Sequence, residues 1–423
     1  FLPDCAAAAG AALRQPSLPL WLPDAVRAEA ASLSARSSYH FADMAPAAVE
    51  ALYGKTLPLS ASKLDCFAGC RYAFFLQYGL RALPWKQAEF DAPLFGSFVH
   101  DVLEHVVREA QAQGGFAALT DAQVAALTER CMDVCMQTYL PQGDARASRE
   151  GYLSTRNRQE AAAVVLDVAR ELRLSQFTPA AEELTFAPGG QMPPIVYHAS
   201  RGDGLLTGKI DRVDTYEKDG TTYFRIVDYK TGRKDFSYTD LLYGKDLQML
   251  LYLFALQENQ KKAGHPMQPA GALYVPGRCD MIRLEPGEDA GEADAERRKQ
   301  LRRKGLVLQD EAVLQAMEHY DGEPQYLPVQ LKKDGLTGDL ATPAQLAALE
   351  RFVTGQVAAM IDEILSGKTQ PNPVDRGPAD SACRWCDYSS ACHKDVCAVS
   401  PRRFAAVKAD EFWQEIERRQ RHG

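Results

Sequence analysis

The sequence of 423 residues lacks any segment that would place it in a membrane or on a secretory route. No apolar run approaches the roughly 18 residues of a membrane-spanning helix. The alanine-rich stretch from Ala6 to Leu13 is not preceded by basic residues, as a signal peptide would be. We therefore expect a cytoplasmic protein with no membrane partner. Because the chain opens with Phe1 rather than methionine, we also expect a fragment or a truncated product.

The sequence also lacks an excess of positive charge and a nucleotide-binding loop. Its 48 lysines and arginines are outnumbered by 56 acidic residues, and the net charge of −8 argues against binding nucleic acid over the whole surface. Gly54-Lys55-Thr56 resembles the end of a phosphate-binding loop, but Val49 stands where that motif needs glycine. Any ATP chemistry therefore lies outside this chain.

Ten cysteines occur in a chain without a secretory signal, so we expect reduced thiols or metal ligands rather than disulfides. Cys383 and Cys386 form a CxxC pair, and Cys392 follows closely. A fourth thiolate from Cys70 or Cys397 would complete a site for zinc or for a four-iron cluster. If Cys70 is that ligand, the metal site ties the beginning of a long segment to its end and stabilises the fold by several kcal/mol, an approximate chain-entropy figure.

The most informative segment runs from Gly208 to Tyr252. Asp219-Gly220 is a strong signal for a two-residue hairpin turn, and residues rich in β-branched and aromatic side chains flank it. In such a hairpin the numbers of facing residues sum to 439, as 219 and 220 do. Asp211 therefore faces Asp228, and their Cβ atoms should lie roughly 4.5–5.5 Å apart on one side of the sheet.

The two sides of this hairpin differ in composition. The side of the two aspartates also carries Val213, Ile226 and Phe224, so we expect it to face the core. The opposite side pairs Asp214 with Arg225, as an ordinary stabilising face should.

Two facing carboxylates at the end of an apolar face repel each other and lose hydration. A bound cation removes both problems, and oxygen ligands favour Mg²⁺, Mn²⁺ or Ca²⁺ over zinc. Lys230 follows Asp228 by two residues and points to the same side, where it could orient a metal-bound water or stabilise a phosphoryl charge. The alternative is a surface hairpin with solvated charges.

Three further side chains are candidates for this site. Gln248 and Tyr252 share one face of a helix expected over 246–258, which is apolar nearly all round. They either make ordinary core hydrogen bonds or lie near a phosphate or Lys230. His100, on a helix expected over 96–112, can complete a metal sphere, although a single helical histidine more often has a structural role.

The remaining pattern is one of helices around the hairpin region 180–230. Ser60 or Ser62 is expected to cap the first helix. Six cations in Arg297-Arg298-Lys299 and Arg302-Arg303-Lys304 form either a solvated helix face or a phosphate-contacting surface. Further helices are expected over 64–78, 121–139, 156–175, 294–304 (in a polar segment 277–341), 342–366 and 401–421, and a strand over 270–275.

Taken in chain order, these motifs resemble the PD-(D/E)xK nuclease domain of the RecB type, and most closely the C-terminal nuclease of the AddB subunit of bacterial AddAB helicase–nucleases. The resemblance covers roughly residues 59–400. The matching positions are Leu59 to Leu64 with Cys70, Gly96 to His100 with Leu103-Glu104, Gly208 to Asp214, Asp228 to Lys230, Gln248, Tyr252, Leu301 to Leu308, Cys383, Cys386 and Cys392.

The resemblance implies an α/β fold of the PD-(D/E)xK (restriction-endonuclease-like) type, with a mixed central sheet flanked by helices. It implies a metal site, a catalytic lysine and an iron–sulfur staple that joins the two ends of the domain, with Cys397 as an extra cysteine. The implied roles are as follows: metal ligands His100, Asp211, Asp228 and the Tyr229 carbonyl; catalytic residues Lys230, Asp228, Asp211, Gln248 and Tyr252; and [4Fe–4S] ligands Cys70, Cys383, Cys386 and Cys392.

The same resemblance implies Mg²⁺- or Mn²⁺-dependent hydrolysis of a single DNA strand. An AddA-type helicase–nuclease subunit would deliver that strand during double-strand-break repair. It also implies a division of the chain into a remnant of a helicase-like region or linker (1–58), the nuclease domain (59–400) and a C-terminal helix (401–423). Two alternatives remain, a non-catalytic DNA-binding scaffold and an iron–sulfur redox protein. The intact carboxylates and lysine argue against the first, and the second would not need them.

Overall fold

The protein is represented by a computed structural model. It describes residues 42–84, 92–139, 149–279, 282, 290–333, 335–377, 380–392 and 401–422. Among these residues, no helix combines the length and the apolar character needed to cross a bilayer.

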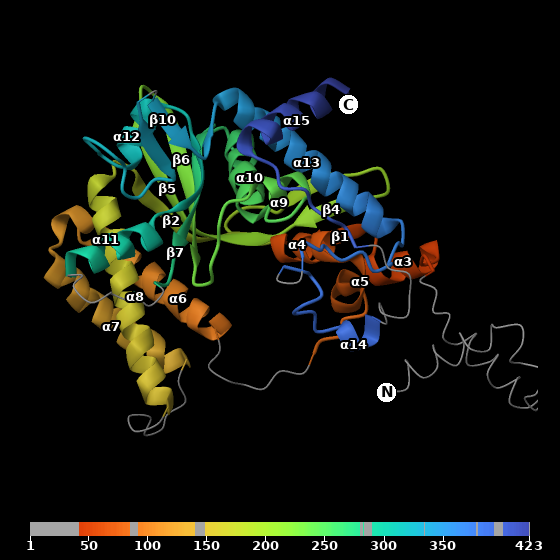
Figure 1. Ribbon diagram of the computed structural model, residues 1–423, viewed down its shortest axis with the longest axis horizontal. Helices are drawn as coiled ribbons and strands as arrows, with labels where there is room; N and C mark the ends of the chain where they lie inside the picture. The colour runs from red at the N-terminus through yellow and green to blue at the C-terminus, as the bar shows by residue number, and fades with distance from the viewer. Residues whose placement is uncertain are drawn as a thin grey trace, which may run out of the picture.

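A mixed sheet forms the centre of the fold (Figure 1), and its strand order in the described chain is β11-β8-β7-β6-β5-β2. The pairs β6–β7 and β8–β11 are parallel, and the other neighbours are antiparallel. The strands are β2 (Thr178–Phe186), β5 (Gly208–Lys218), β6 (Thr221–Lys230), β7 (Gln268–Pro276), β8 (Lys304–Leu308) and β11 (Leu340–Ala341).

Helices cover both faces of this sheet, as the expected α/β fold requires. Because side chains alternate along a strand, neighbours on β6 enter different cores. Ile226 lies in one core with α10 (Gln248–Lys262) and α13 (Pro343–Leu365). Val227 lies in another core with α6 (Ala92–Ala112), α7 (Asp121–Tyr139) and α8 (Arg149–Leu174).

The hairpin has the predicted turn and register. Asp219 and Gly220 have φ angles of 52° and 77°, as a turn with two positive φ values needs. Arg212 pairs with Val227, and the residue numbers of each facing pair along β5 and β6 sum to 439. The predicted pairing of Asp214 with Arg225 is confirmed, with Arg225 Nε 2.9 Å from Asp214 Oδ2, and the helices bury both side chains completely.

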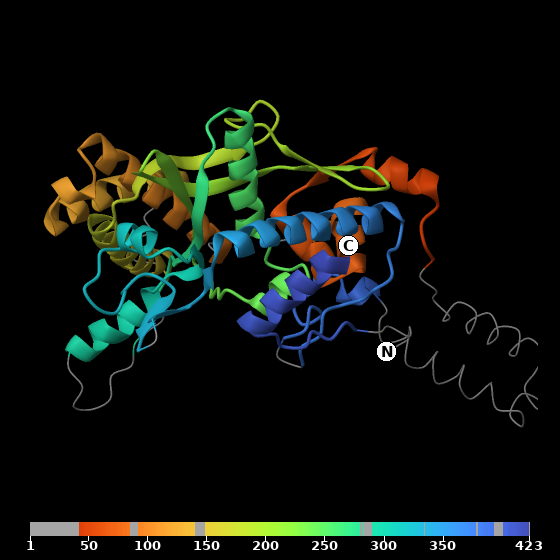
Figure 2. The ribbon, with the colours of Figure 1, turned by 90° about the horizontal axis from the view of Figure 1, so that it is seen from above.

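Segments before and after the central sheet pack against the same core. Strand β1 (Thr56–Leu59) pairs in parallel with β4 (Asp203–Leu206), and β4 pairs with β3 (Ile195–His198). Helix α3 (Pro46–Tyr53) and the C-terminal helix α15 (Ala409–His422) both contribute side chains to the core that α13 lines. In Figure 2, α15 lies beside α13. The proposed domain boundaries stay predictions.

The helix expected over 64–78 is broken. Ser60 caps α4 (Ala61–Gly69), and its side chain accepts a hydrogen bond from Lys63 N at 3.3 Å. The chain becomes extended at Cys70 and continues as α5 (Arg71–Phe74) and a π-helical turn, η2 (Phe75–Gly79).

The polar segment 277–341 contributes more to the sheet than the sequence predicted. It holds β8, an interior strand, and α11 (Ala290–Leu301) ends before the second half of the basic run. The expectation of one helix through residue 304 is therefore wrong. The remaining elements are η3 (Phe116–Ala118), α9 (Tyr238–Leu242), α12 (Glu311–Met317), β9 (Val329–Lys332), β10 (Gly335–Gly338) and α14 (Ser389–Cys392).

Candidate active site

The predicted metal ligands meet at one edge of the central sheet. Because β5 and β6 are antiparallel, the start of β5 lies beside the end of β6. Asp211 and Asp228 are 8% and 4% exposed, so water solvates neither carboxylate well. Asp211 accepts a hydrogen bond from the backbone N–H of Tyr229 at 2.8 Å. The carboxylate of one strand is thus fixed against the main chain of the next.

His100 approaches this edge from α6. Its Nε2 lies 2.6 Å from the carbonyl oxygen of Tyr229, and its Nδ1 lies 3.3 Å from Asp211 Oδ2. Burial disfavours the charged imidazolium, but the hydrogen bond to Asp211 and the charges of Asp211 and Asp228 outweigh it and raise the pKa of His100. The structure therefore brings together the groups that the resemblance implies as ligands.

Asp228 lies at the centre of a second set of contacts. Its Oδ2 is 2.7 Å from Lys230 Nζ, and its Oδ1 accepts a 2.9 Å hydrogen bond from Gln248 Nε2. Gln248 Oε1 in turn accepts a 3.4 Å hydrogen bond from Lys230 Nζ. Burial and the charge of Asp211 raise the pKa of Asp228 to about 6, even though Lys230 opposes the shift. This buried carboxylate pair favours a bound cation.

Tyr252 lies behind this site rather than at its opening. Its ring stacks on Phe186 with centroids 6.2 Å apart, and burial raises its pKa to about 12. The tyrosine explains Gly208, because a Cβ atom there would lie 2.4 Å from Tyr252 Oη. Of the two helix positions predicted for the site, the structure brings Gln248 to the carboxylates and packs Tyr252 against the start of β5. The catalytic role of Tyr252 stays a prediction.

Glu183 on β2 is a candidate that sequence reasoning missed. Its carboxylate, His100 and Asp211 each offer a ligand atom, and these atoms all lie within 4.8 Å of one another. Glu183 also pairs with Lys209, and its φ of 53° is a left-handed value that non-glycine residues rarely adopt. Backbone strain of this kind concentrates at functional sites. The only sequence signal was an acidic residue in the strand that precedes the hairpin.

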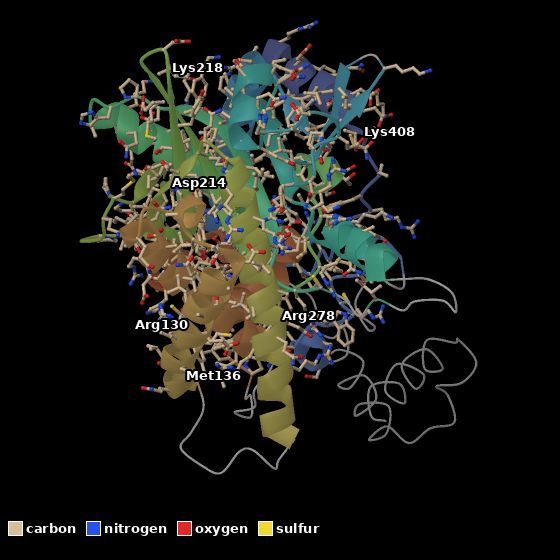
Figure 3. The ribbon with its side chains drawn as sticks, turned by 90° about the vertical axis from the view of Figure 1, so that its left-hand side faces the viewer. Arg130, Met136, Asp214, Lys218, Arg278 and Lys408 are labelled. Carbon is tan, nitrogen blue, oxygen red and sulfur yellow. The ribbon has the colours of Figure 1, made fainter. Side chains whose placement is uncertain are left out.

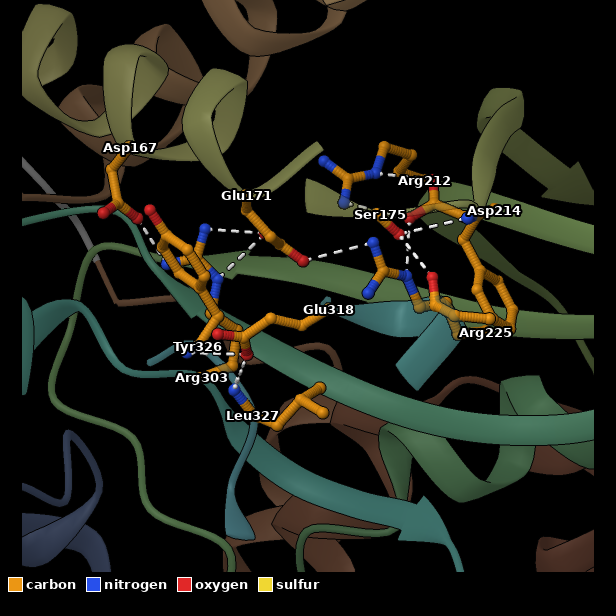
Figure 4. Close-up of polar contacts among 12 residues, drawn as sticks. Asp167, Glu171, Ser175, Arg212, Asp214, Arg225, Arg303, Glu318, Tyr326 and Leu327 are labelled. Atoms are coloured by element: carbon orange, nitrogen blue, oxygen red, sulfur yellow. Dashed lines mark hydrogen bonds and ion pairs between the residues drawn. The ribbon is translucent and has the colours of Figure 1, made fainter. Parts of the chain in front are cut away.

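A buried chain of charged side chains underlies the site (Figure 4). Arg212 donates to Asp214 at 2.8 Å and, through Nη1, to the Tyr229 hydroxyl at 2.7 Å. Arg225 donates to Asp214 at 2.9 Å, and its Nη2 lies 3.1 Å from Glu171 of α8. The network therefore connects the helix layer to the strands that carry the metal ligands.

Arg303 closes this chain of charges at its other end. Its Nη2 lies 2.7 Å from Glu171 Oε2, and it also pairs with Asp167. Arg303 is 1% exposed, and Arg302 donates to the carbonyl oxygen of Leu327 at 2.8 Å. The interpretation of the whole run 297–304 as one solvated or phosphate-contacting helix face is therefore wrong.

The predicted cysteine ligands gather around one small pocket. Cys70, Cys383, Cys386 and Cys392 line it, and its other walls include Pro371, Pro373 and Ala382. Helices α5 and α14 lie side by side there, although they are far apart in the sequence (Figure 1). Cys397 lies outside the described residues.

Hydrogen bonds within the protein hold segments 70–82 and 371–392 together at this pocket. Arg71 N donates to Asn372 Oδ1 at 3.0 Å, and Tyr388 donates to the carbonyl oxygen of Ala82 at 2.9 Å. Cys66 lies nearby, but burial raises its pKa to about 12, and its thiol lies 3.5 Å from Gln77 Oε1. The pocket lining thus includes the four predicted ligands but not the neighbouring Cys66.

This fold and this sheet edge define the class of the protein. The chain belongs to the PD-(D/E)XK nuclease superfamily, whose family profile matches residues 58–393. Curated relatives that are named as one subunit of an ATP-dependent helicase/deoxyribonuclease are similar to it. The chain is 32% identical over 375 residues to the relative in Acetivibrio thermocellus, and 31% identical over 381 and 387 residues to those in Thermoanaerobacter sp. and Clostridium kluyveri. The resemblance seen in the sequence is confirmed.

These alignments cover 86%, 88% and 87% of this chain but 32%, 33% and 33% of the relatives. The chain therefore spans about a third of the length of the curated relatives it matches.

Proposed function

We propose that this chain is a metal-dependent deoxyribonuclease that hydrolyses phosphodiester bonds of a single DNA strand. The observation that carries the proposal is the common edge of β5 and β6. There the buried pair Asp211 and Asp228 lies with His100, and Lys230 contacts Asp228 at 2.7 Å. The relatives are named as part of a helicase/deoxyribonuclease, which supports the same chemistry.

The residues present fit a divalent metal ion. Carboxylate oxygens and one imidazole are ligands that suit Mg²⁺ or Mn²⁺, and the close grouping of His100, Glu183 and Asp211 offers three donors at once. We assign His100, Asp211 and Asp228 as the holders of the ion, with the Tyr229 carbonyl and Glu183 as additional donors. The bound ion would polarise the phosphate and lower the pKa of a water molecule.

The remaining steps fall to side chains of the chain itself. Lys230 is 30% exposed, so its ammonium can reach a substrate while it stays paired with Asp228. We assign it to hold the attacking water or a phosphate oxygen during in-line displacement. Gln248 contacts both members of this pair and fixes their orientation. Tyr252 supports the start of β5 and keeps Asp211 in register.

The four cysteines support a [4Fe–4S] cluster as a staple. A four-iron cluster is held by four thiolates, and the lining of one pocket by all four of these cysteines supports this assignment. The apolar walls of the pocket suit such a group, which would tie α5 to α14.

We further propose that the strand comes from a partner motor of the AddA type. The relatives are named as components of an enzyme that combines helicase and deoxyribonuclease activity, and no nucleotide-binding loop occurs in this chain. The process served would be double-strand-break repair in a bacterial cytoplasm.

The decisive experiment supplies single-stranded DNA directly, so that no motor is needed. Wild type and Asp228→Asn are incubated with the strand in Mg²⁺ or Mn²⁺, and the cleavage rate is measured. Asp219→Asn is the matched control, because Asp219 lies in the hairpin turn, away from the site, and asparagine tolerates its φ of 52°. We expect cleavage by wild type and the control, and none by Asp228→Asn.

Equal degradation by wild type and Asp228→Asn would reject this site as the source of cleavage. An inert wild type that still binds DNA would favour the non-catalytic scaffold. Reversible redox chemistry without cleavage would favour the iron–sulfur redox protein.

A further inference from the structure

A basic cavity of about 270 Å³ opens beside the predicted metal ligands at the same edge of the central sheet. Lys230 belongs to its wall, so the cavity adjoins the proposed active site. Two acidic residues, Asp235 and Glu296, also line it. Its six cationic residues are Lys230, Arg233, Lys234, Arg278, Lys299 and Lys304.

The topology of the sheet explains why cations gather here. Strands β6 and β7 are parallel, so their carboxyl ends meet, and the antiparallel strand β8 begins at the same edge. The segment 230–234 leaves β6, Arg278 follows β7 and Lys304 opens β8. A 2.8 Å hydrogen bond from Gly277 N to the carbonyl of Lys230 joins the first two. Figure 3 shows Arg278 away from the hairpin tip at Lys218.

Acidic side chains in and around the cavity pair with five of its six cations, and the most exposed of these pairs are those of Lys299 and Lys304. Lys304 lies 3.7 Å from Asp235 with side chains 42% and 67% exposed, and such exposed pairs are weak. Lys299 and Glu296 form a similar exposed pair at 3.3 Å. Within the part of the chain that the structure describes, Arg233 has no ion pair. An anion that enters the cavity therefore meets three cations that it can recruit at little cost: Arg233, Lys299 and Lys304.

Resting on the nuclease function proposed above, we infer that this cavity binds the phosphates of a single DNA strand next to the bond that is cut. Lys230 lies between Asp228 and the cavity, so a strand with its reactive phosphate at Lys230 runs on into it. Lysine and arginine contacts to phosphate carry no sequence preference.

The test measures DNA binding apart from cleavage. Wild type and Arg233→Gln/Lys304→Gln are titrated against fluorescein-labelled oligodeoxythymidine in EDTA, with anisotropy as the readout and a series of salt concentrations. Each lost phosphate contact to a single strand removes about 0.7 from the slope of log affinity against log salt. We expect the slope of the double variant to fall by about 1.4.

Lys218→Gln/Lys262→Gln is the matched control. It removes the same charge at the hairpin tip and at the end of α10, just before β7 begins, and both lie at the opposite end of the sheet. The control should keep the wild-type slope. A wild-type slope in the cavity variant would overturn the inference, as would an equal loss of slope in the control.

Cleavage in Mg²⁺ separates this inference from the function on which it rests. A wild type that never cuts DNA, but whose salt slope depends on Arg233 and Lys304, overturns the nuclease function and supports the cavity as a strand site. A wild type that cuts DNA, with a cavity variant that binds and cuts equally well, overturns the cavity assignment alone.

Discussion

Arg212 Nη1 donates a 2.7 Å hydrogen bond to the hydroxyl of Tyr229, and the main chain of the same tyrosine lies in the proposed metal site. The backbone N–H of Tyr229 binds Asp211, and its carbonyl oxygen lies 2.6 Å from His100 Nε2. The buried network of charged side chains between the sheet and the helices therefore contacts the proposed metal site through Tyr229. Anything that shifts this side chain should also shift the backbone that positions two ligands.

The first prediction concerns Tyr229→Phe. The variant keeps the backbone but leaves a buried donor of Arg212 without its partner, which should lower the free energy of unfolding by about 1–3 kcal/mol. Urea unfolding measures this loss, and titration with Mn²⁺ should show weaker metal binding as well. Tyr216→Phe is the control on β5, because no hydrogen bond of the Tyr216 hydroxyl is found among the described residues. Equal stability of the two variants would refute the coupling.

The second prediction concerns Lys230→Met. Loss of one electrostatic or proton-transferring group should slow single-turnover cleavage by about 10²–10³-fold. Metal binding should persist, because removing the Lys230 ammonium from beside Asp228 increases the attraction of the site for a metal cation. Lys218→Met, on the same hairpin but at its tip, should cleave like wild type. If Lys230→Met instead lost metal binding together with cleavage, Lys230 would be a structural partner of Asp228.

The third prediction concerns the cysteine pocket. Cys386→Ser should lose bound iron and the brown colour of the cluster, because it removes one of four thiolates. Cys66→Ser should keep the iron, since Cys66 lies outside the pocket lining. Metal analysis of purified protein checks both variants. One zinc ion per chain in wild type would reject the iron–sulfur assignment.

Local chemistry made the core of the site predictable. Asp219-Gly220 allows essentially one tight turn, and that turn sets the register that brings Asp211 beside Asp228. The clustering of Cys383, Cys386 and Cys392 was likewise readable from spacing. These features depend on residues close in the chain, so few alternative structures compete.

Long-range contacts made the rest unpredictable. A basic run normally indicates surface, yet Arg303 is buried because Asp167 and Glu171, more than 130 residues earlier, accept its hydrogen bonds. Glu183 reaches His100 only through a left-handed backbone, which no residue pattern announces. Whether a charged side chain is solvated or paired thus depended on which helix covers it.

The last prediction concerns acid stability and Glu171. Burial alone would raise the pKa of this carboxyl, but the charges of Arg303, Arg225 and Arg212 outweigh burial and lower the pKa to about 2. Between pH 4.5 and about 2 the folded chain therefore binds fewer protons here than the unfolded chain does. Its stabilising contribution is full above pH 4.5 and is lost as the pH falls toward 2.

The difference in pKa corresponds to about 3 kcal/mol of unfolding free energy. Glu171→Gln should be less stable near neutral pH, because it leaves buried arginines uncompensated. Its unfolding free energy should change less than that of wild type as the pH falls from about 6 to about 3, a span that includes the upper part of the window between pH 4.5 and about 2 in which Glu171 loses its contribution. Glu415 provides the control, since Arg418 and Arg419 also lower its pKa to about 2, but on an exposed helix where solvent screens the interaction. Urea unfolding at several pH values should therefore show a flatter profile for Glu171→Gln and a nearly wild-type profile for Glu415→Gln. Two indistinguishable profiles would mean that the buried network contributes no more to acid stability than a surface pair does.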